Sequence, residues 1–249
     1  MTDPTPPRPA SSDRIVLIHG FTQTAACWAP IDEALADHQV VALDAPGHGT
    51  SSAQRLDLAD GARALAERGG RGTYLGYSMG GRFSLHAALA RPDLVERLIL
   101  VSATAGIDDE SERDARRAAD DALAEHLLAV GVPTFVDEWL ALPLFAGLPP
   151  ERAHRRARLA NTADGLASSL RLAGTGTQAP LWGRLGELAM PVLVVAGADD
   201  PKYLALAERL TAGIGSSAEL AVVARAGHTV HLEQPAAFLA VLEPWLRRA

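Results

Sequence analysis

A serine bracketed by glycines, Gly76-Tyr77-Ser78-Met79-Gly80, stands between a β-rich run, Thr73-Tyr74-Leu75, and a helical run from Arg82 to Arg91. A strand-to-helix turn this tight favours glycine two positions before and two positions after the serine, and it lifts the serine hydroxyl out of the sheet. The first amides of the following helix favour negative charge beside that hydroxyl. Because so short a pattern also occurs by chance, it predicts a catalytic serine only if partner residues follow.

Such partners follow later in the chain. The apolar run from Pro191 to Gly197 predicts a buried parallel strand, with Asp199 and Asp200 just beyond its carboxyl end. His228 follows another β-rich run, about one helix and one strand further on. The order serine, acid, histidine is that of the α/β-hydrolase fold and differs from the two familiar protease orders. Spacing leaves both aspartates open as the acid, whereas His228, an ordinary loop histidine if taken singly, becomes a catalytic candidate within this set.

An oxyanion hole needs a second backbone donor from the loop after a neighbouring strand. The apolar run from Arg14 to Ile18 is followed by His19-Gly20-Phe21, and the Phe21 amide is the candidate donor beside that of Met79. We expect the His19 side chain to fasten this loop by hydrogen bonds rather than to transfer protons. The alternative for this His-Gly pair is an ordinary turn.

Composition limits the cellular setting and the class of partner. The chain has 249 residues, of which 48% are hydrophobic, which suits one large α/β domain with a buried sheet. It has no apolar run of membrane-spanning length, and its Pro-rich polar start differs from a signal sequence, so we expect a cytoplasmic protein. The single cysteine, Cys27, forbids an internal disulfide and suits a reducing compartment. A net charge of −7 argues against nucleic acids and anionic membranes as partners.

Short β-rich runs alternate with helical stretches, which predicts a mostly parallel, doubly wound sheet of about six strands. In such sheets ligands bind beyond the carboxyl ends of the strands, where the candidate residues above all stand. The expected strands are Ile15 to Ile18, Val40 to Leu43, Thr73 to Leu75, Arg97 to Val101, Val192 to Ala196 and Leu220 to Val223.

One long segment breaks this alternation. No strand is evident from about residue 107 to 184, which we interpret as a helical lid inserted between two parts of the core, residues 1–106 and 185–249. The lid is acidic in its first half and arginine-rich in its second, from Glu151 onward. A basic stretch in an acidic chain suggests a small substrate that carries carboxylates, although a solvated helix face is the alternative for each arginine. Trp139 and Trp182 are candidates to line the pocket or to pack within the lid.

The chain resembles the MenH family, the 2-succinyl-6-hydroxy-2,4-cyclohexadiene-1-carboxylate synthases, which have the α/β-hydrolase fold and catalyse an elimination. The His-Gly, Pro-Gly-His-Gly and Ala-Gly-His pieces of the resemblance are shared by many hydrolases. Three stretches are more specific: Arg82 directly after Ser-Met-Gly-Gly, Gly174-Thr175-Gly176-Thr177-Gln178, and Asp200-Pro201-Lys202-Tyr203.

The resemblance implies a role for individual residues. It assigns Ser78, Asp200 and His228 to a catalytic triad and so favours Asp200 over Asp199. It implies backbone oxyanion donors at Phe21 and Met79, and substrate contacts at Tyr77, Arg82, Trp139 and Arg158. Asp120-Asp121 departs from the family, because some members have a basic substrate contact there.

Arg82 also fits a binding role by its position alone. It lies one helical turn after Ser78, where its guanidinium could hold a carboxylate near the reacting atoms. The alternative is a surface arginine on the helix.

The resemblance further implies the reaction: loss of pyruvate from 2-succinyl-5-enolpyruvyl-6-hydroxy-3-cyclohexene-1-carboxylate, with Ser78 as the base and without a metal or organic cofactor. One alternative is a carboxylesterase or carbon–carbon bond hydrolase of the same fold, in which Ser78 is a covalent nucleophile. A non-catalytic binding protein is the other.

Overall fold

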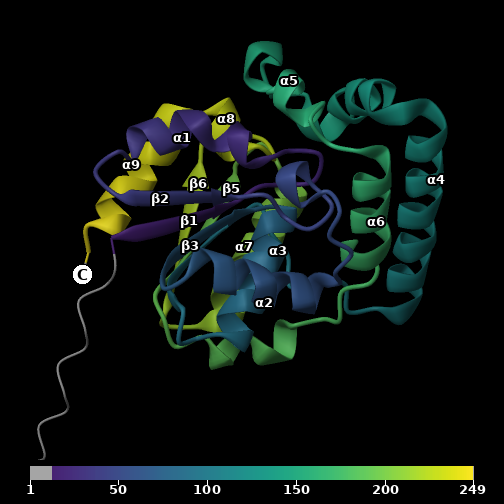
Figure 1. The fold of residues 1–249 in the computed structure, drawn as a ribbon. Helices are drawn as coiled ribbons and strands as arrows, with labels where there is room; N and C mark the ends of the chain where they lie inside the picture. The colour runs from purple at the N-terminus through teal and green to yellow at the C-terminus, as the bar shows by residue number, and fades with distance from the viewer. Residues whose placement is uncertain (1–12, 249) are drawn as a thin grey trace, which may run out of the picture.

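The computed structural model describes residues 13–248, so the Pro-rich run before them lies outside the described residues (Figure 1). Within this range lies a six-stranded sheet in the order β2-β1-β3-β4-β5-β6, and each neighbouring pair is parallel. Each predicted strand lies inside an observed one, which confirms the predicted α/β sheet. The strands are β1 (Arg14–Ile18), β2 (Gln39–Leu43), β3 (Gly72–Tyr77), β4 (Val95–Val101), β5 (Val192–Gly197) and β6 (Ala218–Val223).

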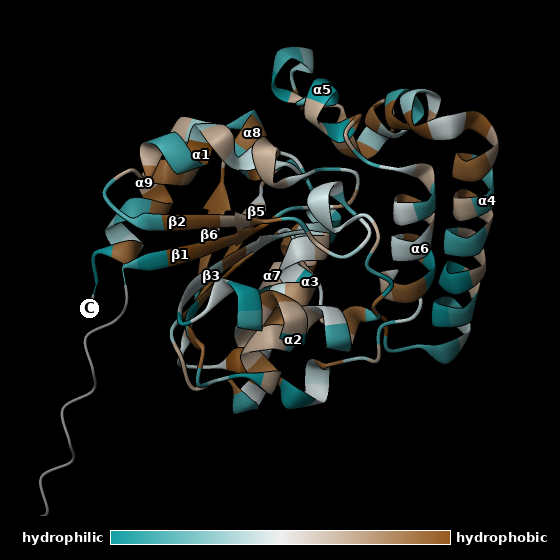
Figure 2. Ribbon diagram, in the orientation of Figure 1, coloured by the Kyte–Doolittle hydropathy of each residue, from teal (hydrophilic) through white to brown (hydrophobic). Residues whose placement is uncertain are grey.

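Helices cover both faces of the sheet, because the side chains of a buried strand alternate between two apolar layers. Val16 and Ile18 belong to a core that also contains residues of α2 (Leu58–Gly69), α3 (Met79–Ala90) and α7 (Pro201–Ile214). Ile15 and Leu17 belong to the opposite core, with residues of α1 (Ala29–Ala34), α8 (Val230–Glu233) and α9 (Pro235–Leu246). The hydrophobic strands between the two helical layers are visible in Figure 2.

Between β4 and β5 the chain leaves the sheet and forms a helical insertion. In the described residues 102–191 it holds no strand, as predicted. Its helices are α4 (Glu110–Leu140), α5 (Arg155–Arg158) and α6 (Ala163–Ala173), with 3-10 turns η3 (Pro143–Phe145), η4 (Pro150–Arg152) and η5 (Trp182–Glu187). The predicted lid boundaries at residues 107 and 184 stay a prediction.

The insertion has an apolar core of its own. Leu127 and Val136 of α4 pack with Leu166 and Leu170 of α6, and Figure 1 shows these two helices side by side beyond the end of the sheet. A kink in α4 lies at Gly131, where φ is 78°, two residues before Pro133. Within residues 13–248, no helix combines the length and hydropathy needed to cross a membrane.

Candidate active site

The turn from β3 into α3 places Ser78 in a conformation that ordinary residues avoid. Its φ of 51° and ψ of −109° lie in a region that favours glycine and costs free energy for a serine. A Cβ atom at Gly80 would overlap the Ile18 carbonyl, and one at Gly76 would overlap the Gly80 carbonyl. Both flanking glycines are therefore required by close backbone approach, as the sequence pattern predicted.

Ser78, His228 and Asp200 form a continuous hydrogen-bonded chain. His228 Nε2 lies 3.1 Å from Ser78 Oγ, and His228 Nδ1 lies 3.0 Å from Asp200 Oδ2. The His228 imidazole and the Asp200 carboxylate are both buried, whereas Asp199 is exposed and its side chain makes no hydrogen bond to His228 in the described structure. The geometry therefore selects Asp200 from the two aspartates that spacing left open.

Asp200 stays ionised in this setting. Burial raises the pKa of its carboxyl, but hydrogen bonds from His228 and from the Tyr203 amide, 3.2 Å from Oδ1, outweigh burial and bring the pKa below its usual value. An anionic Asp200 accepts the Nδ1 proton of His228, which leaves Nε2 free to accept a proton from Ser78.

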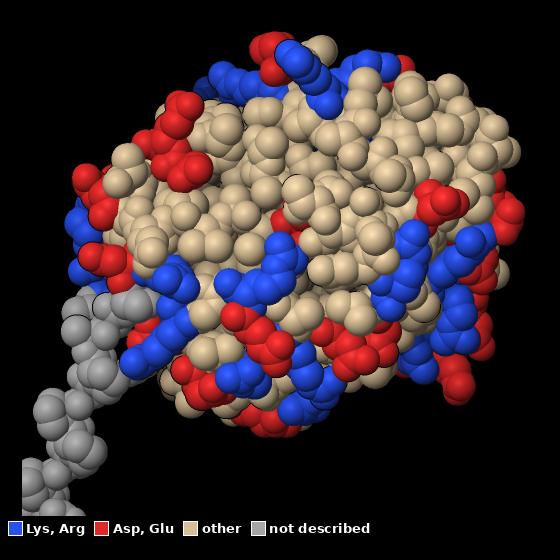
Figure 3. Space-filling model, viewed as in Figure 1, with Lys and Arg blue, Asp and Glu red and all other residues tan. Residues whose placement is uncertain are grey.

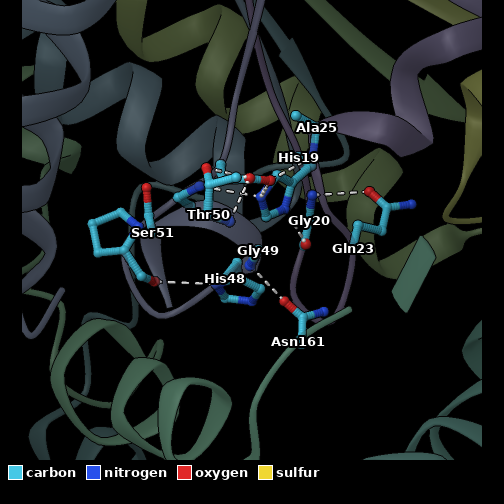
Figure 4. Close-up of polar contacts among 12 residues, drawn as sticks. His19, Gly20, Gln23, Ala25, His48, Gly49, Thr50, Ser51 and Asn161 are labelled. Atoms are coloured by element: carbon cyan, nitrogen blue, oxygen red, sulfur yellow. Dashed lines mark hydrogen bonds and ion pairs between the residues drawn. The ribbon is translucent and has the colours of Figure 1, made fainter. Parts of the chain in front are cut away.

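Phe21 and Met79 both lie at the cavity into which Ser78 opens. Met79 is the first residue of α3, and the first amides of a helix have no carbonyl partner within it. The loop that carries Phe21 is held by the Gly20 amide, which donates to Gln23 Oε1 at 3.0 Å (Figure 4). One backbone amide at the start of a helix and one on a loop held by a hydrogen bond are thus available beside the serine.

His19 fastens this loop, as the sequence analysis expected. Its Nδ1 lies 2.8 Å from the Gly20 carbonyl, and its Nε2 accepts from the Ala45 amide at 3.1 Å. Burial lowers the pKa of His19 to about 4, so the ring is neutral near neutral pH.

The insertion reaches the same loops through Asn161. Its Oδ1 accepts from the Gly49 amide at 2.9 Å, and its Nδ2 donates to the Thr22 carbonyl at 2.7 Å. Figure 4 shows Asn161 pointing toward the loops that carry His48, Gly49 and Gly20. The two loops after β1 and β2 are therefore fixed relative to the insertion.

The cavity, about 200 Å³ in volume, is cationic, and no aspartate or glutamate of the described chain lines it. Arg82 lines it and is only 7% exposed, so the alternative of a surface helix arginine is wrong. The one side-chain hydrogen bond of this guanidinium within residues 13–248 is a long one, 3.5 Å from Arg82 Nη1 to Gln178 Oε1. Burial lowers the pKa of Arg82 to about 10, so the guanidinium stays protonated near neutral pH. No carboxylate of the described residues forms an ion pair with this buried positive charge, because Asp120 pairs with Arg116.

Arg116 is a lining residue that the sequence analysis missed. It projects from α4, and its Nε lies 2.8 Å from Oδ1 of Asp120, one helical turn further along. Asp120, one of the two aspartates that depart from the family pattern, therefore holds Arg116 at the cavity. An arginine and an aspartate four residues apart on a helix were the available signal.

Lys202 and Tyr203 also line the cavity, beside the triad. The Tyr203 ring centroid lies 4.3 Å from that of His228. Both residues stood in a stretch quoted for the family resemblance, although no contact was assigned to them. No cluster of three or more metal-ligating side chains is found in the described part of the chain.

Tyr77, Trp139 and Arg158, for which the resemblance implies substrate contacts, all line the cavity. The Tyr77 hydroxyl lies 3.3 Å from Thr229 Oγ1, and burial raises its pKa. The Trp139 ring packs edge-on against Phe21, with centroids 5.1 Å apart. Arg158 is buried and donates to the Ala153 carbonyl at 2.8 Å and to Thr22 Oγ1, so it also ties the insertion to the Phe21 loop.

Two alternatives that the sequence left open for the insertion are resolved. Trp182 does not line the cavity; its indole nitrogen donates to the Gly106 carbonyl at 3.0 Å and its ring packs under Arg209. Arg155, Arg171 and Arg184 instead pair with exposed acids. Figure 3 accordingly shows basic and acidic side chains interleaved over α4 and α6. Of the arginines in the second half of the insertion, Arg158 alone lines the cavity in the described structure.

Known proteins match this arrangement along nearly the whole chain. A model of the alpha/beta hydrolase family matches residues 15–241. A relative from Bacillus subtilis (strain 168) is 35% identical over 96% of this chain and 92% of its own. The 2-succinyl-6-hydroxy-2,4-cyclohexadiene-1-carboxylate synthase of Serratia proteamaculans (strain 568) is 32% identical over 93% of this chain and 92% of its own.

Solved structures agree with the sequence matches. The structure of MenH from S. aureus superposes with a TM-score of 0.87 at 31% identity, and the match covers 96% of this chain and 95% of that one. An esterase from Thermogutta terrifontis, 24% identical with a TM-score of 0.79, covers 95% and 90% and shares the fold. The chain belongs to the alpha/beta hydrolase family and, within it, to the family of 2-succinyl-6-hydroxy-2,4-cyclohexadiene-1-carboxylate synthases, MenH.

Proposed function

We propose that this chain is a carbon–oxygen lyase that eliminates pyruvate from 2-succinyl-5-enolpyruvyl-6-hydroxy-3-cyclohexene-1-carboxylate, with Ser78, His228 and Asp200 as its catalytic triad. The substrate class comes from the named relatives. The observation on this chain that carries the proposal is Arg82, a buried cation without a carboxylate partner among the described residues, in the same cavity as Ser78. A substrate with several carboxylates is its electrostatic complement.

In the proposed mechanism, His228 Nε2 takes the proton of Ser78 Oγ, and the resulting alkoxide removes a proton from the ring carbon beside the succinyl carbonyl. The electron pair of that C–H bond moves through the ring and breaks the bond to the enolpyruvyl oxygen. Enolpyruvate leaves and, after gaining a proton on carbon, becomes pyruvate. Asp200 stabilises the imidazolium that forms on His228.

The same step places negative charge on the carbonyl oxygen next to the carbon that loses its proton. The Phe21 and Met79 amides are proposed to hold this oxyanion, since both residues lie at the cavity beside Ser78. Removal of one donor of this kind typically lowers kcat by about a hundredfold or more.

Substrate binding is proposed to involve Arg82, Tyr77, Trp139 and Arg158. Trp139 and Arg158 come from the insertion, residues 107–184, which we infer to be a lid over the cavity. Support for this comes from Arg116 and Phe145 as well, because these two side chains also reach the cavity from the insertion.

The test is an assay of the purified protein with 2-succinyl-5-enolpyruvyl-6-hydroxy-3-cyclohexene-1-carboxylate, in which pyruvate release is followed by a coupled dehydrogenase. We expect turnover by the wild type and none by Ser78→Ala. Failure to release pyruvate, together with rapid hydrolysis of simple esters and a trapped acyl group on Ser78, would instead identify a serine hydrolase of the same fold.

A further inference from the structure

Glu233 is a buried carboxylate that the proposed mechanism leaves without a role. It lies at the end of α8, is 4% exposed, and its Oε2 accepts from the Gly227 amide at 2.6 Å while its Oε1 accepts from the Thr229 amide at 2.8 Å. These two amides flank His228 on both sides. One carboxylate thus holds the backbone immediately before and immediately after the candidate general base.

The two hydrogen bonds to Glu233 are strengthened by the negative charge of its carboxylate. Hydrogen bonds to an ionised acceptor are roughly twice as strong as neutral ones, and a carboxylate has an oxygen for each of the two amides. An amide side chain offers a single oxygen, and its NH2 group would face a second N–H donor. Substitution of Glu233 by Gln therefore breaks one of the two bonds with little change in side-chain volume.

The helical insertion touches this carboxylate directly. A Cβ atom at Gly147, between η3 and η4, would overlap Glu233 Oε2, and Arg152 Nη1 donates to the Glu233 carbonyl at 3.2 Å. The preceding Leu232 packs with Phe145, Leu148 and Ala153 of the insertion. The segment around Gly147 therefore rests on the residue that holds the His228 loop.

We propose that Glu233 is the positioning residue of His228, and that the insertion acts on His228 through the contact of Gly147 with the Glu233 carboxylate. This inference rests on the proposed roles of Ser78 and His228. It needs no particular substrate, because it concerns the alignment of His228 Nε2 with Ser78 Oγ, now 3.1 Å apart. Misplacement of a reacting group by about 1 Å can lower a rate by about a hundredfold.

The experiment measures how fast a fluorophosphonate labels Ser78. The serine oxygen attacks phosphorus, fluoride leaves, and the serine proton passes to His228, so the rate reports alignment of the pair whatever the natural substrate is. Glu233→Gln is expected to lower the labelling rate per folded molecule by about tenfold to a hundredfold. In parallel, the downfield NMR signal of the His228 Nδ1 proton should shift or broaden, and kcat should fall with KM nearly unchanged.

Glycine variants test the link to the insertion. Gly147→Ala should slow labelling several-fold, whereas Gly183→Ala, where an added Cβ meets nothing within 4 Å, should label at the wild-type rate. In the Glu233→Ala background the methyl group at residue 147 has room, so Gly147→Ala should then have little further effect. Multiplicative losses in this double variant would overturn the link to the insertion.

Wild-type labelling and an unchanged His228 signal in folded Glu233→Gln would overturn the positioning role. If Glu233→Gln does not fold, Gly147→Ala decides alone, and a wild-type labelling rate in that variant rejects the proposal. Absence of pyruvate release with labelling that follows these expectations would reject the proposed elimination while leaving the role of Glu233 intact.

Discussion

At the scale of single residues, Arg82 joins binding to a cost in stability. A guanidinium that is 7% exposed and forms no ion pair with an acid among the described residues is desolvated, and attraction to the Asp120 carboxylate compensates only part of that cost. The free energy that it costs the empty protein is recovered when a carboxylate binds. Selection for binding and selection for stability therefore act in opposite directions at this position.

Arg82→Met should separate the two effects. A charge-assisted hydrogen bond contributes about 1.5–3 kcal/mol, so we expect the KM for the tricarboxylate substrate to rise roughly tenfold to hundredfold. Thermal unfolding of the free variant should shift upward. The control is Arg184→Met, which removes an exposed arginine paired with Glu187 and should leave KM unchanged. A lower unfolding temperature in Arg82→Met would show that a compensating contact holds this guanidinium.

At Ser78, too, a feature that the function needs lowers the stability of the fold, here through the backbone conformation. Its φ of 51° and ψ of −109° suit glycine, and such conformations cost a serine about 1–3 kcal/mol. We expect Ser78→Gly to have an unfolding free energy about 1 kcal/mol above that of Ser78→Ala in urea titrations, with both variants inactive. Ala119→Gly is the control, because Ala119 is exposed within α4, where glycine should lower the unfolding free energy by about 1 kcal/mol. Equal stabilities of the two Ser78 variants would contradict strain at the turn.

At the scale of elements, α4 is joined to the loop after α6 by Asp120. This carboxylate pairs with Arg116 at 2.8 Å and lies 3.4 Å from the Gly176 amide. A Cβ atom at Gly174 would overlap the Leu170 carbonyl and would lie 2.5 Å from Asp120 Oδ2, which explains glycine at that position of the Gly174–Gln178 stretch. The contact of Asp120 in α4 with the loop after α6 thus fixes where Arg116 enters the cavity.

Asp120→Asn should weaken that placement. The neutral amide keeps one acceptor but loses the ion pair, so we expect KM to rise several-fold, up to about tenfold, with kcat nearly constant. The matched control is Asp121→Asn at the neighbouring position, because Asp121 is exposed and lies 3.9 Å from Arg171. Steady-state kinetics of the two variants decide the point, and equal KM values would reject the anchoring role.

The strands and the order of the triad could be predicted because they depend on local signals. Apolar runs, a glycine-bracketed serine and an acid or histidine at a strand end are visible within a few residues of sequence. The direction in which a helix of the insertion points a side chain depends on the helices packed against it. For this reason the sequence left open whether Trp182 lines the cavity or packs within the insertion, and it did not point to Arg116 or Glu233.

At the scale of the whole molecule, buried histidines make stability depend on pH. Burial lowers the pKa of His19 to about 4 and the pKa values of His48 and His231 to about 3. In the unfolded chain a histidine titrates near 6.5. Between these values the unfolded state binds more protons than the folded state, so the unfolding free energy falls as pH falls below about 6.5. Each such histidine contributes up to about 1.4 kcal/mol per pH unit.

His231 isolates one of these contributions. Its ring lies between those of Trp28 and Tyr77, with centroids 4.5 and 4.6 Å away, and neither ring nitrogen has a hydrogen-bond partner in the described structure. His231→Phe therefore loses no hydrogen bond within residues 13–248 and cannot take up a proton. Urea unfolding between pH 7.5 and 5 should show a smaller slope than in the wild type, by up to about 1.4 kcal/mol per pH unit.

His231→Gln provides the comparison for this slope. Glutamine also does not titrate, so the slope should fall equally, but it buries an amide without partners and should lower the unfolding free energy at every pH. The two variants thus separate proton uptake, which changes the slope, from polarity, which changes the level. If both variants keep the wild-type slope, His231 does not contribute to it, and other titrating groups make the unfolding free energy depend on pH below about 6.5.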